Sequence, residues 1–334
     1  MIDLADLHLD PAAIQRFGKS GTAYQRGNLL AAAAALPRRD PAAAADRIYH
    51  ASVLLAVGRV DQAQRLLAGV PRNQPGRRAL ERMIAAVRWE AAAEWPLPAL
   101  ATASEALAES YYLQSRTDLE PTRLAALRAT ELAPHNGFAW TRVAELEFSA
   151  GHTKAAREAI EKGLALTPEN ARAHALQGFI LSAENRIREA QVAFQHAVRL
   201  DGGFGNGWLG LGLTKIKLGH LLEGRADLQT AATVEPTSSI FHSYLGKAFS
   251  QEGLADKAAL DLKLAAILDP ADPTPLLYSA LESQRQNRPN TAIGELEQSI
   301  QLNDNRRLYR SRFLLDQDRA VRGANLRHPD LTGK

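Results

Sequence analysis

The stretch "LTPEN" at residues 166–170 is one of a series of similar turns in this chain. The other members are "LAPHN" at 132–136, "LDGGF" at 200–204, "VEPTS" at 234–238, "LDPAD" at 268–272 and "LNDNR" at 302–306. Each places a proline, glycine or aspartate after an apolar stretch, and these residues, from Pro134 to Asp304, recur every 34 residues. A fixed period of this length indicates a solenoid of stacked helical hairpins.

Small residues recur at two positions of this repeat. With the turn residue counted as position 32, position 8 is Ala144, Gly178, Gly212, Gly246 and Ala280. Position 20 is Ala156, Ala190, Gly224, Ala258 and Ala292. Two helices packed 8–10 Å apart need small residues where they approach most closely, so positions 8 and 20 are expected to face each other within one hairpin.

Position 15, between the two predicted helices, is always glycine or asparagine: Gly151, Asn185, Gly219, Gly253 and Asn287. Both residue types tolerate the left-handed conformation that ends many helices. Together these positions make residues 137–306 resemble five tetratricopeptide repeats. The resemblance implies an all-α fold, a right-handed α-solenoid in which every repeat is a helix–turn–helix.

The pattern weakens outside residues 137–306. Residues 101–136 fit a degenerate repeat, with Ser110 and Thr122 at positions 8 and 20. Residues 1–100 are expected to be an irregular helical region with degenerate hairpins, at 23–36 and more clearly at 45–70, and a joint at 89–100. Residues 307–334 are expected to form a capping helix and tail.

The stretch "GNGWLG" at residues 205–210 fits the glycine pattern of dinucleotide-binding sites, and Asp227 follows at a suitable distance. That pattern binds a pyrophosphate only between a β-strand and a helix. The preceding stretch "REAQVAFQHAVRLD" has the pattern of the second helix of a repeat, and Trp208 stands where tetratricopeptide repeats favour tryptophan. These glycines are therefore interpreted as packing and turn residues.

Composition gives little support to other functional classes. The chain of 334 residues has no cysteine, and its 40 basic and 37 acidic residues leave a net charge of only +3. Thiol chemistry is thereby excluded and nucleic-acid binding is not favoured. No apolar run is long enough to span a bilayer, and residues 1–6 do not resemble a signal peptide, although the chain could be a fragment of a longer protein.

Motifs for catalysis or metal binding are missing from the sequence. There is no phosphate-binding loop, no nucleophile elbow and no histidine cluster at metal-ligand spacing. His174 and His242 stand at position 4, where Trp140 and Trp208 stand in other repeats, and are interpreted as packing residues. The sequence predicts no enzyme activity, no cofactor and no metal.

The resemblance to tetratricopeptide repeats implies a groove lined by the first helix of each repeat, and a protein or peptide partner bound within it. Arg142, Arg172 and Lys247 are expected to engage carboxylates or carbonyls of that partner. The predicted function is a non-catalytic protein–protein interaction scaffold. The predicted groove residues are Phe138, Arg142, Arg172, Phe179, Leu209, Leu213, Ile216, Tyr244, Lys247, Leu277, Tyr278 and Leu281.

A second resemblance concerns particular stretches. "LNDNRRLYRSRFLLDQDRAVRGANL" at 302–326, "LAESYYLQSR" at 107–116 and "GNGWLGLGL" at 205–213 are similar to bacterial cell-envelope proteins in which a FecR-like domain precedes tetratricopeptide repeats. This similarity implies an excised internal region and a periplasmic or envelope location; without it, a cytoplasmic location is expected. The alternative function is a structural spacer or self-associating segment of such a protein.

Overall fold

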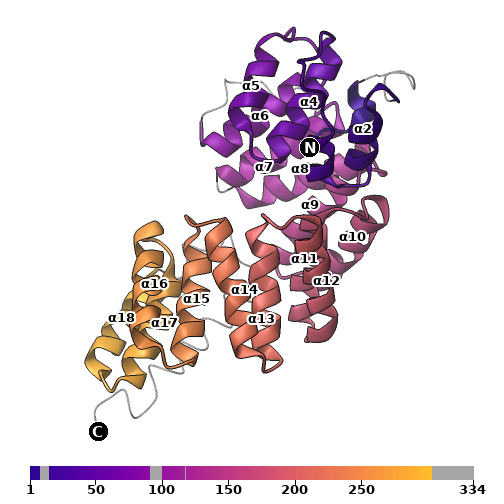
Figure 1. Cartoon of the computed structure of the whole chain (residues 1–334). Coiled ribbons are helices and arrows are strands. Elements are labelled where there is room, and N and C mark those ends of the chain that lie inside the picture. Colours follow the sequence, from indigo (N-terminus) through magenta and orange to yellow (C-terminus); the bar gives the residue numbers. More distant parts are fainter. Residues whose placement is uncertain (8–14, 91–99, 117, 303–334) are drawn as a thin grey trace. The chain divides into compact units, whose positions relative to one another are not determined.

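The computed structural model describes residues 1–7, 15–90, 100–116 and 118–302, and over these ranges it is all-α (Figure 1). They contain seventeen α-helices and one short 3-10 helix, and no strand. The predicted α-solenoid is therefore confirmed. The predicted capping helix at 307–334 and most of the predicted joint at 89–100 lie outside the described residues.

The chain forms two compact units. Unit 1 comprises Met1–Glu147 with Lys154–Ala173, and unit 2 comprises Phe148–Thr153 with His174–Lys334. The elements of unit 1 are η1 (Leu4–Leu7), α2 (Gly18–Gln25), α3 (Leu29–Ala34), α4 (Ala44–Ala56), α5 (Val60–Ala68), α6 (Arg77–Arg88), α7 (Ala103–Ser115), α8 (Leu119–Leu132), α9 (Gly137–Ser149) and α10 (Thr153–Leu166).

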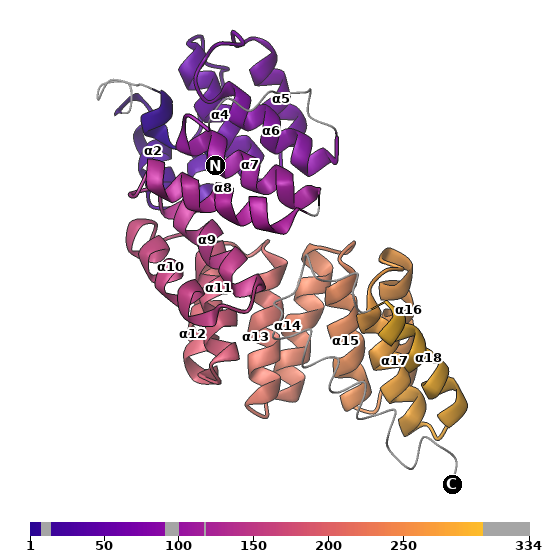
Figure 2. The ribbon, with the colours of Figure 1, turned by 180° about the vertical axis from the view of Figure 1, so that it is seen from behind.

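Unit 2 continues the series with four further hairpins. Its helices are α11 (Ala171–Ala183), α12 (Ile187–Leu200), α13 (Gly205–Lys217), α14 (Leu221–Val234), α15 (Ser239–Gln251), α16 (Ala255–Leu268), α17 (Pro273–Arg285) and α18 (Pro289–Gln301). Figure 2 shows these helices as a row of antiparallel pairs. The odd-numbered helices from α7 to α17 are the first helices of their hairpins, and their starts, from Ala103 to Pro273, are 34 residues apart.

The small residues of the repeat lie where two helices meet, as the sequence predicts. A Cβ atom at Gly212 on α13 would lie 2.6 Å from the carbonyl oxygen of Gly224 on α14, and one at Gly246 would lie 2.7 Å from Leu262. The turn prediction is also confirmed, because the residue at position 15 has a positive φ in every repeat. These angles are 86° at Gly151, 61° at Asn185, 94° at Gly219, 78° at Gly253 and 55° at Asn287.

In three repeats the residue at position 4 connects the hairpin to the turn before it. The indole N–H of Trp140 donates to the carbonyl of Pro134, and that of Trp208 donates to the carbonyl of Gly202, both at 2.8 Å. His242 holds the same place, with Nε2 3.0 Å from the Pro236 carbonyl oxygen. The ring therefore satisfies a carbonyl at the end of the preceding helix, which explains the structural role predicted for His242.

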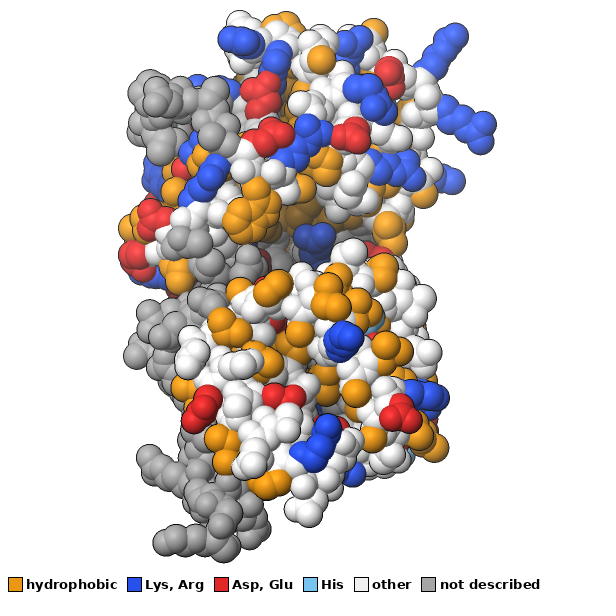
Figure 3. All heavy atoms as spheres, turned by 90° about the vertical axis from the view of Figure 1, so that its left-hand side faces the viewer, with side chains coloured by type: hydrophobic (Ala, Val, Ile, Leu, Met, Phe, Trp, Pro, Cys, Tyr) orange, Lys and Arg blue, Asp and Glu red, His pale blue; other side chains and the backbone are white. Residues whose placement is uncertain are grey.

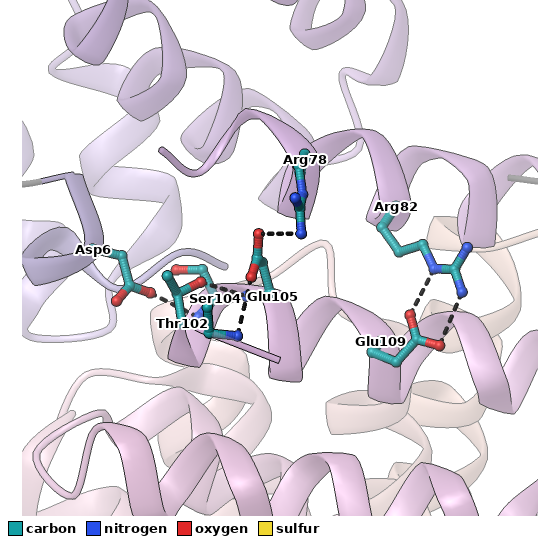
Figure 4. A network of polar contacts seen from close by, with 8 residues as sticks. Asp6, Arg78, Arg82, Thr102, Ser104, Glu105 and Glu109 are labelled. Carbon is teal, nitrogen blue, oxygen red and sulfur yellow. Dashed lines mark hydrogen bonds and ion pairs between the residues drawn. The ribbon is translucent and has the colours of Figure 1, made fainter. Parts of the chain in front are cut away.

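Unit 1 departs from the regular pattern around α6. This helix packs against both α5 and α7, and no second helix of its own lies in the described residues. Two ion pairs join it to α7, Arg82 with Glu109 at 2.6 Å and Arg78 with Glu105 at 3.0 Å (Figure 4). The hairpin predicted at 45–70 is present as α4 and α5, whereas the one predicted at 23–36 begins earlier, with α2.

Candidate partner-binding surface

The predicted groove residues of unit 1 are mostly inaccessible. The side chain of Phe138 is buried, with its ring centroid 5.5 Å from that of Tyr24. Arg142 is only 1% exposed. Arg172 is exposed. Of these three residues, only Arg172 has an exposed side chain.

Arg142 is held by neighbours within unit 1. Its guanidinium donates to the hydroxyl of Ser110 at 3.0 Å, to the amide oxygen of Gln114 at 2.7 Å and to the carboxylate of Glu145 at 2.9 Å. The guanidinium carbon also lies 4.1 Å from the centroid of the Tyr111 ring. A buried cation requires such partners. Arg142 therefore cannot engage a partner's carboxylate, as the sequence suggested, without leaving these groups.

In unit 2 the first helices of successive hairpins lie side by side, since α13 contacts α15 and α15 contacts α17. Leu209 and Leu277 are buried in the core between the helices. The other predicted residues of unit 2 are half-buried and thus reach the surface. We call them the helix-A surface: Phe179, Leu213, Ile216, Tyr244, Lys247, Tyr278 and Leu281.

The helix-A surface is continuous over several repeats. Phe179 on α11, Leu213 and Ile216 on α13, and Tyr244 on α15 all pack against one hydrophobic cluster. That cluster is built on buried residues of α13 to α16, among them Leu228 and Phe241. The structure therefore brings together apolar side chains from three repeats, although they are 65 residues apart at the extremes, from 179 to 244.

Aromatic and basic groups extend this surface to α17. The rings of Tyr244 and Tyr278 are tilted by 58° with centroids 5.7 Å apart. The ammonium nitrogen of Lys247 lies 4.9 Å from the centroid of the Tyr278 ring, within cation–π range. This end of the surface combines two phenol rings with a positive charge, a composition suited to contact with another protein.

A polar cluster between the last turns of α15 and α17 was not found from the sequence. The hydroxyl of Ser250 donates to the buried carboxylate of Glu282, and the side-chain amide of Gln286 donates to the same carboxylate at 2.9 Å. Arg285 donates to the Ser250 carbonyl at 2.5 Å. No periodic signal marks these residues, because the contacts of Ser250 with Glu282 and Arg285 join two neighbouring repeats.

The structure also tests the sequence features that would indicate a dinucleotide site, a metal site or a membrane span. "GNGWLG" lies on α13 and follows the helix α12, so the strand that a dinucleotide site needs is not there. Within the described ranges no three His, Asp or Glu side chains are grouped as metal ligands. None of the described helices combines the length and hydropathy needed to cross a membrane.

The exposed face of unit 2 seen in the lower part of Figure 3 shows mainly hydrophobic and uncharged side chains, with few charged ones. The upper part, which shows unit 1, carries many more lysine and arginine side chains. The side chains that each unit shows in this view therefore differ in chemistry, although the net charge of the whole chain is close to zero for its size.

Comparison with known proteins shows the fold. The chain superposes with a TM-score of 0.60 on the anaphase-promoting complex hetero-tetramer Cut9–Hcn1, at 16% identity over 87% of this chain and 54% of that one. It superposes with a TM-score of 0.52 on a tetratricopeptide repeat protein from Parabacteroides merdae, at 13% identity over 83% of this chain and 97% of that one. The chain has the tetratricopeptide-repeat fold.

The sequence comparisons are more limited. Anaphase-promoting complex subunit 3 of Schizosaccharomyces pombe is 24% identical over 131 residues, which are 39% of this chain and 20% of that protein. No protein-family model matches the chain. The chain thus spans about half of Cut9–Hcn1 and a fifth of subunit 3, and these likenesses do not include a FecR-like domain.

Proposed function

We propose that this chain is a non-catalytic scaffold that binds a peptide or helix of a partner protein on the helix-A surface of unit 2. The observation that supports the proposal is the continuity of Phe179, Leu213, Ile216 and Tyr244 around one cluster, with each side chain half-buried. An apolar surface of this kind, left accessible to water, is typical of a site that another protein covers.

The mode of binding follows from the spacing of the anchors. Apolar groups from successive repeats would hold alternate side chains of an extended peptide, or one face of an amphipathic helix. Lys247, beside the Tyr278 ring, would contact an acidic side chain or a backbone carbonyl of that partner.

The proposal is tested by affinity capture from an extract of the source cells, with captured proteins quantified by mass spectrometry. The native chain is compared with a Tyr244→Asp, Tyr278→Asp variant and with a matched Leu260→Asp, Ile267→Asp variant on the opposite helices of the hairpins. Circular dichroism first establishes that all three are folded. Loss of a protein from the first variant but not from the second supports the proposal. Equal capture by all three contradicts it.

A second candidate function is self-association within a larger assembly. It is favoured by Leu260, Leu264 and Ile267 on α16, of which Leu260 is 69% and Ile267 66% exposed. Their spacing of four and three residues places them on one side of the helix. A second copy of the chain could bury this stripe, as expected for a structural spacer. The bacterial envelope location belongs to this candidate and rests on the similarity of residues 302–326 to FecR-associated proteins.

Light scattering over a range of concentrations distinguishes the two candidates. Self-association predicts a native dimer or higher oligomer that the Leu260→Asp, Ile267→Asp variant converts to a monomer. If the native chain stays monomeric up to about 100 µM, self-association is rejected, because this concentration is far above the dissociation constants usual for stable assemblies.

A further inference from the structure

Residues 2–7 lie inside unit 1 and contact helices far away in the sequence. Ile2 is only 1% exposed, and Leu4 and Leu7 are also buried. Their neighbours in the same hydrophobic cluster come from α2, α4, α6, α7 and α9. Figures 1 and 2, which view the molecule from opposite sides, both place the N-terminus within the outline of these helices.

Two turns of unit 1 that are far apart in the sequence are in contact. The turn after α2 meets the turn after α10, where the backbone N–H of Glu169 donates to the carbonyl of Arg26 at 2.8 Å. The two side chains also form an ion pair at 2.6 Å. Gly27 has a φ of +88°, and a Cβ atom there would lie 2.8 Å from Cβ of Asn170. The contact between these two turns therefore forms without residues 2–7.

The backbone of the segment is bound by side chains of the surrounding helices. The Tyr24 hydroxyl accepts a hydrogen bond from the Ile2 N–H at 2.9 Å and donates one to the Ile2 carbonyl at 2.8 Å. The Ser104 hydroxyl accepts from the Asp3 N–H at 2.8 Å. These hydrogen bonds hold the backbone of residues 2 and 3, just before the short 3-10 helix η1, while Ile2, Leu4 and Leu7 bury their apolar side chains. Proteins bind peptides through the same combination of main-chain hydrogen bonds and apolar contacts.

Both acidic side chains of the segment have dedicated partners. The side-chain amide of Asn136 donates to the Asp3 carboxylate at 3.1 Å. The backbone N–H of Ser104, in the first turn of α7, donates to the Asp6 carboxylate at 2.8 Å (Figure 4). A helix N-terminus favours an anion, since its first N–H groups lack partners within the helix. Each aspartate is therefore bound by a different residue of unit 1.

We infer that unit 1 is a peptide-binding site occupied by the chain's own residues 2–7. Its ligand class is a short acidic peptide with the pattern apolar–Asp–apolar–x–Asp–apolar, which the segment supplies as Ile2 to Leu7. A second protein carrying this pattern must displace the segment before it can bind. The inference concerns unit 1 and is independent of the helix-A surface of unit 2.

The test uses the full-length chain and a synthetic peptide, "MIDLADL" followed by a fluorescein-labelled lysine. Fluorescence anisotropy measures binding to the native chain and to an Ile2→Asp, Leu7→Asp variant. In this variant the two new carboxylates would have to be buried among apolar groups, so residues 2–7 are expected to leave the site. In that variant background, Tyr24→Phe removes the hydroxyl that binds the Ile2 backbone and leaves the ring in place. A peptide with lysine in place of both aspartates is the ligand control.

The inference predicts that the segment variant binds the peptide at least about 100-fold more tightly than the native chain. A tethered competitor at an effective concentration on the order of 1 mM accounts for this difference if the free peptide binds with a Kd near ~10 µM. Tyr24→Phe should weaken binding about tenfold to 100-fold, as expected for two lost hydrogen bonds, and the lysine peptide should not bind.

Three results would overturn the inference. One is equal binding of the peptide to the native chain and the segment variant. Another is no binding to a segment variant that keeps its helical circular dichroism. The third is loss of the folded state of unit 1 in the segment variant, which would make residues 2–7 part of the core and not a ligand.

Discussion

At the scale of single residues, Gly212 and Gly224 show why the repeat needs small side chains. Each lies against the backbone of the other, because a Cβ at Gly212 would be 2.6 Å from the Gly224 carbonyl oxygen and one at Gly224 would be 2.5 Å from the Gly212 carbonyl oxygen. A backbone atom cannot move aside as a flexible side chain does. The hairpin α13–α14 therefore depends on glycine at both places.

Replacing Gly212 with alanine should destabilise unit 2. The added methyl group forces the helices apart, at a cost of about 1–3 kcal/mol that exceeds the ~1 kcal/mol gained in helix propensity. Gly294 on α18 is the matched control, because a Cβ there meets nothing within 4 Å. Urea unfolding should show a loss for Gly212→Ala and no loss for Gly294→Ala; similar behaviour of the two would disprove the close approach.

Buried tyrosines should make unit 1 sensitive to alkaline pH. Burial raises the pKa of Tyr49 to about 12 and also raises that of Tyr24. Because the folded pKa lies above the value of about 10 in an unfolded chain, this contribution to stability is complete below pH 10 and is lost as the pH rises from 10 to about 12.

Equilibrium unfolding between pH 9 and 12 measures this effect. The native free energy of unfolding should fall over that range, by up to about 3 kcal/mol for Tyr49 alone. The Tyr49→Phe variant, which has no group to ionise, should show a shallower fall. An unchanged slope in the variant would mean that Tyr49 ionises as freely in the folded chain as in the unfolded one.

At the scale of elements, α6 is held to α7 by a buried ion pair. Arg82 donates two hydrogen bonds to Glu109, at 2.6 and 2.9 Å, and Glu109 is only 3% exposed. The guanidinium carbon of Arg82 also lies 3.5 Å from the centroid of the Tyr112 ring. This pair fixes a helix that lacks a hairpin partner among the described residues.

The Glu109→Ala variant should lose about 3–5 kcal/mol of stability, because it leaves the Arg82 guanidinium buried without its counter-ion. The exposed pair of Arg128 with Glu131, at 3.0 Å on α8, provides the control. Glu131→Ala should cost less than about 1 kcal/mol. Thermal unfolding of both variants measures the difference, and equal costs would show that the Arg82–Glu109 pair is solvated in solution.

The helices could be predicted from the sequence where the repeat is strict. Position 15 residues such as Asn185 and Asn287 end helices through a left-handed backbone, and position 8 and 20 residues set the contact within each hairpin. These signals are local and recur in five repeats, so the helix boundaries that they predict can be compared across the five repeats of one chain. In unit 1 they are weaker, and α6 was not assigned because no hairpin pattern marks it.

At the scale of the whole molecule, the contacts between distant segments could not be predicted from the sequence. Nothing in the pattern around Asp3 indicates a hydrogen bond to Asn136, 133 residues later. The burial of Arg142 was missed for a related reason, because its partners Ser110 and Gln114 lie in the repeat before it. A one-dimensional pattern assigns residues to faces of helices, whereas burial depends on which other segment covers that face.

The predicted groove residues differ in whether their side chains reach the solvent. Seven of the predicted residues reach the surface in unit 2, whereas Phe138, Arg142, Leu209 and Leu277 are buried. The positions transferred from tetratricopeptide repeats lie on the first helices of the hairpins, and the place of each position on its helix decides whether the side chain reaches the solvent. Tyr244 at position 6 and Leu213 at position 9 do so, whereas Leu209 and Leu277, both at position 5, fill the layer beneath.

The most direct test of the proposed scaffold is photo-crosslinking in an extract of the source cells. The photoreactive residue p-benzoylphenylalanine, close in shape to tyrosine, replaces Tyr244, Tyr278 or, as a control on α16, Leu260. The account predicts adducts with the same protein from positions 244 and 278 after irradiation, and none with it from position 260. Adducts from position 260 alone, or no adduct from either tyrosine position, would contradict the assignment of partner binding to the helix-A surface.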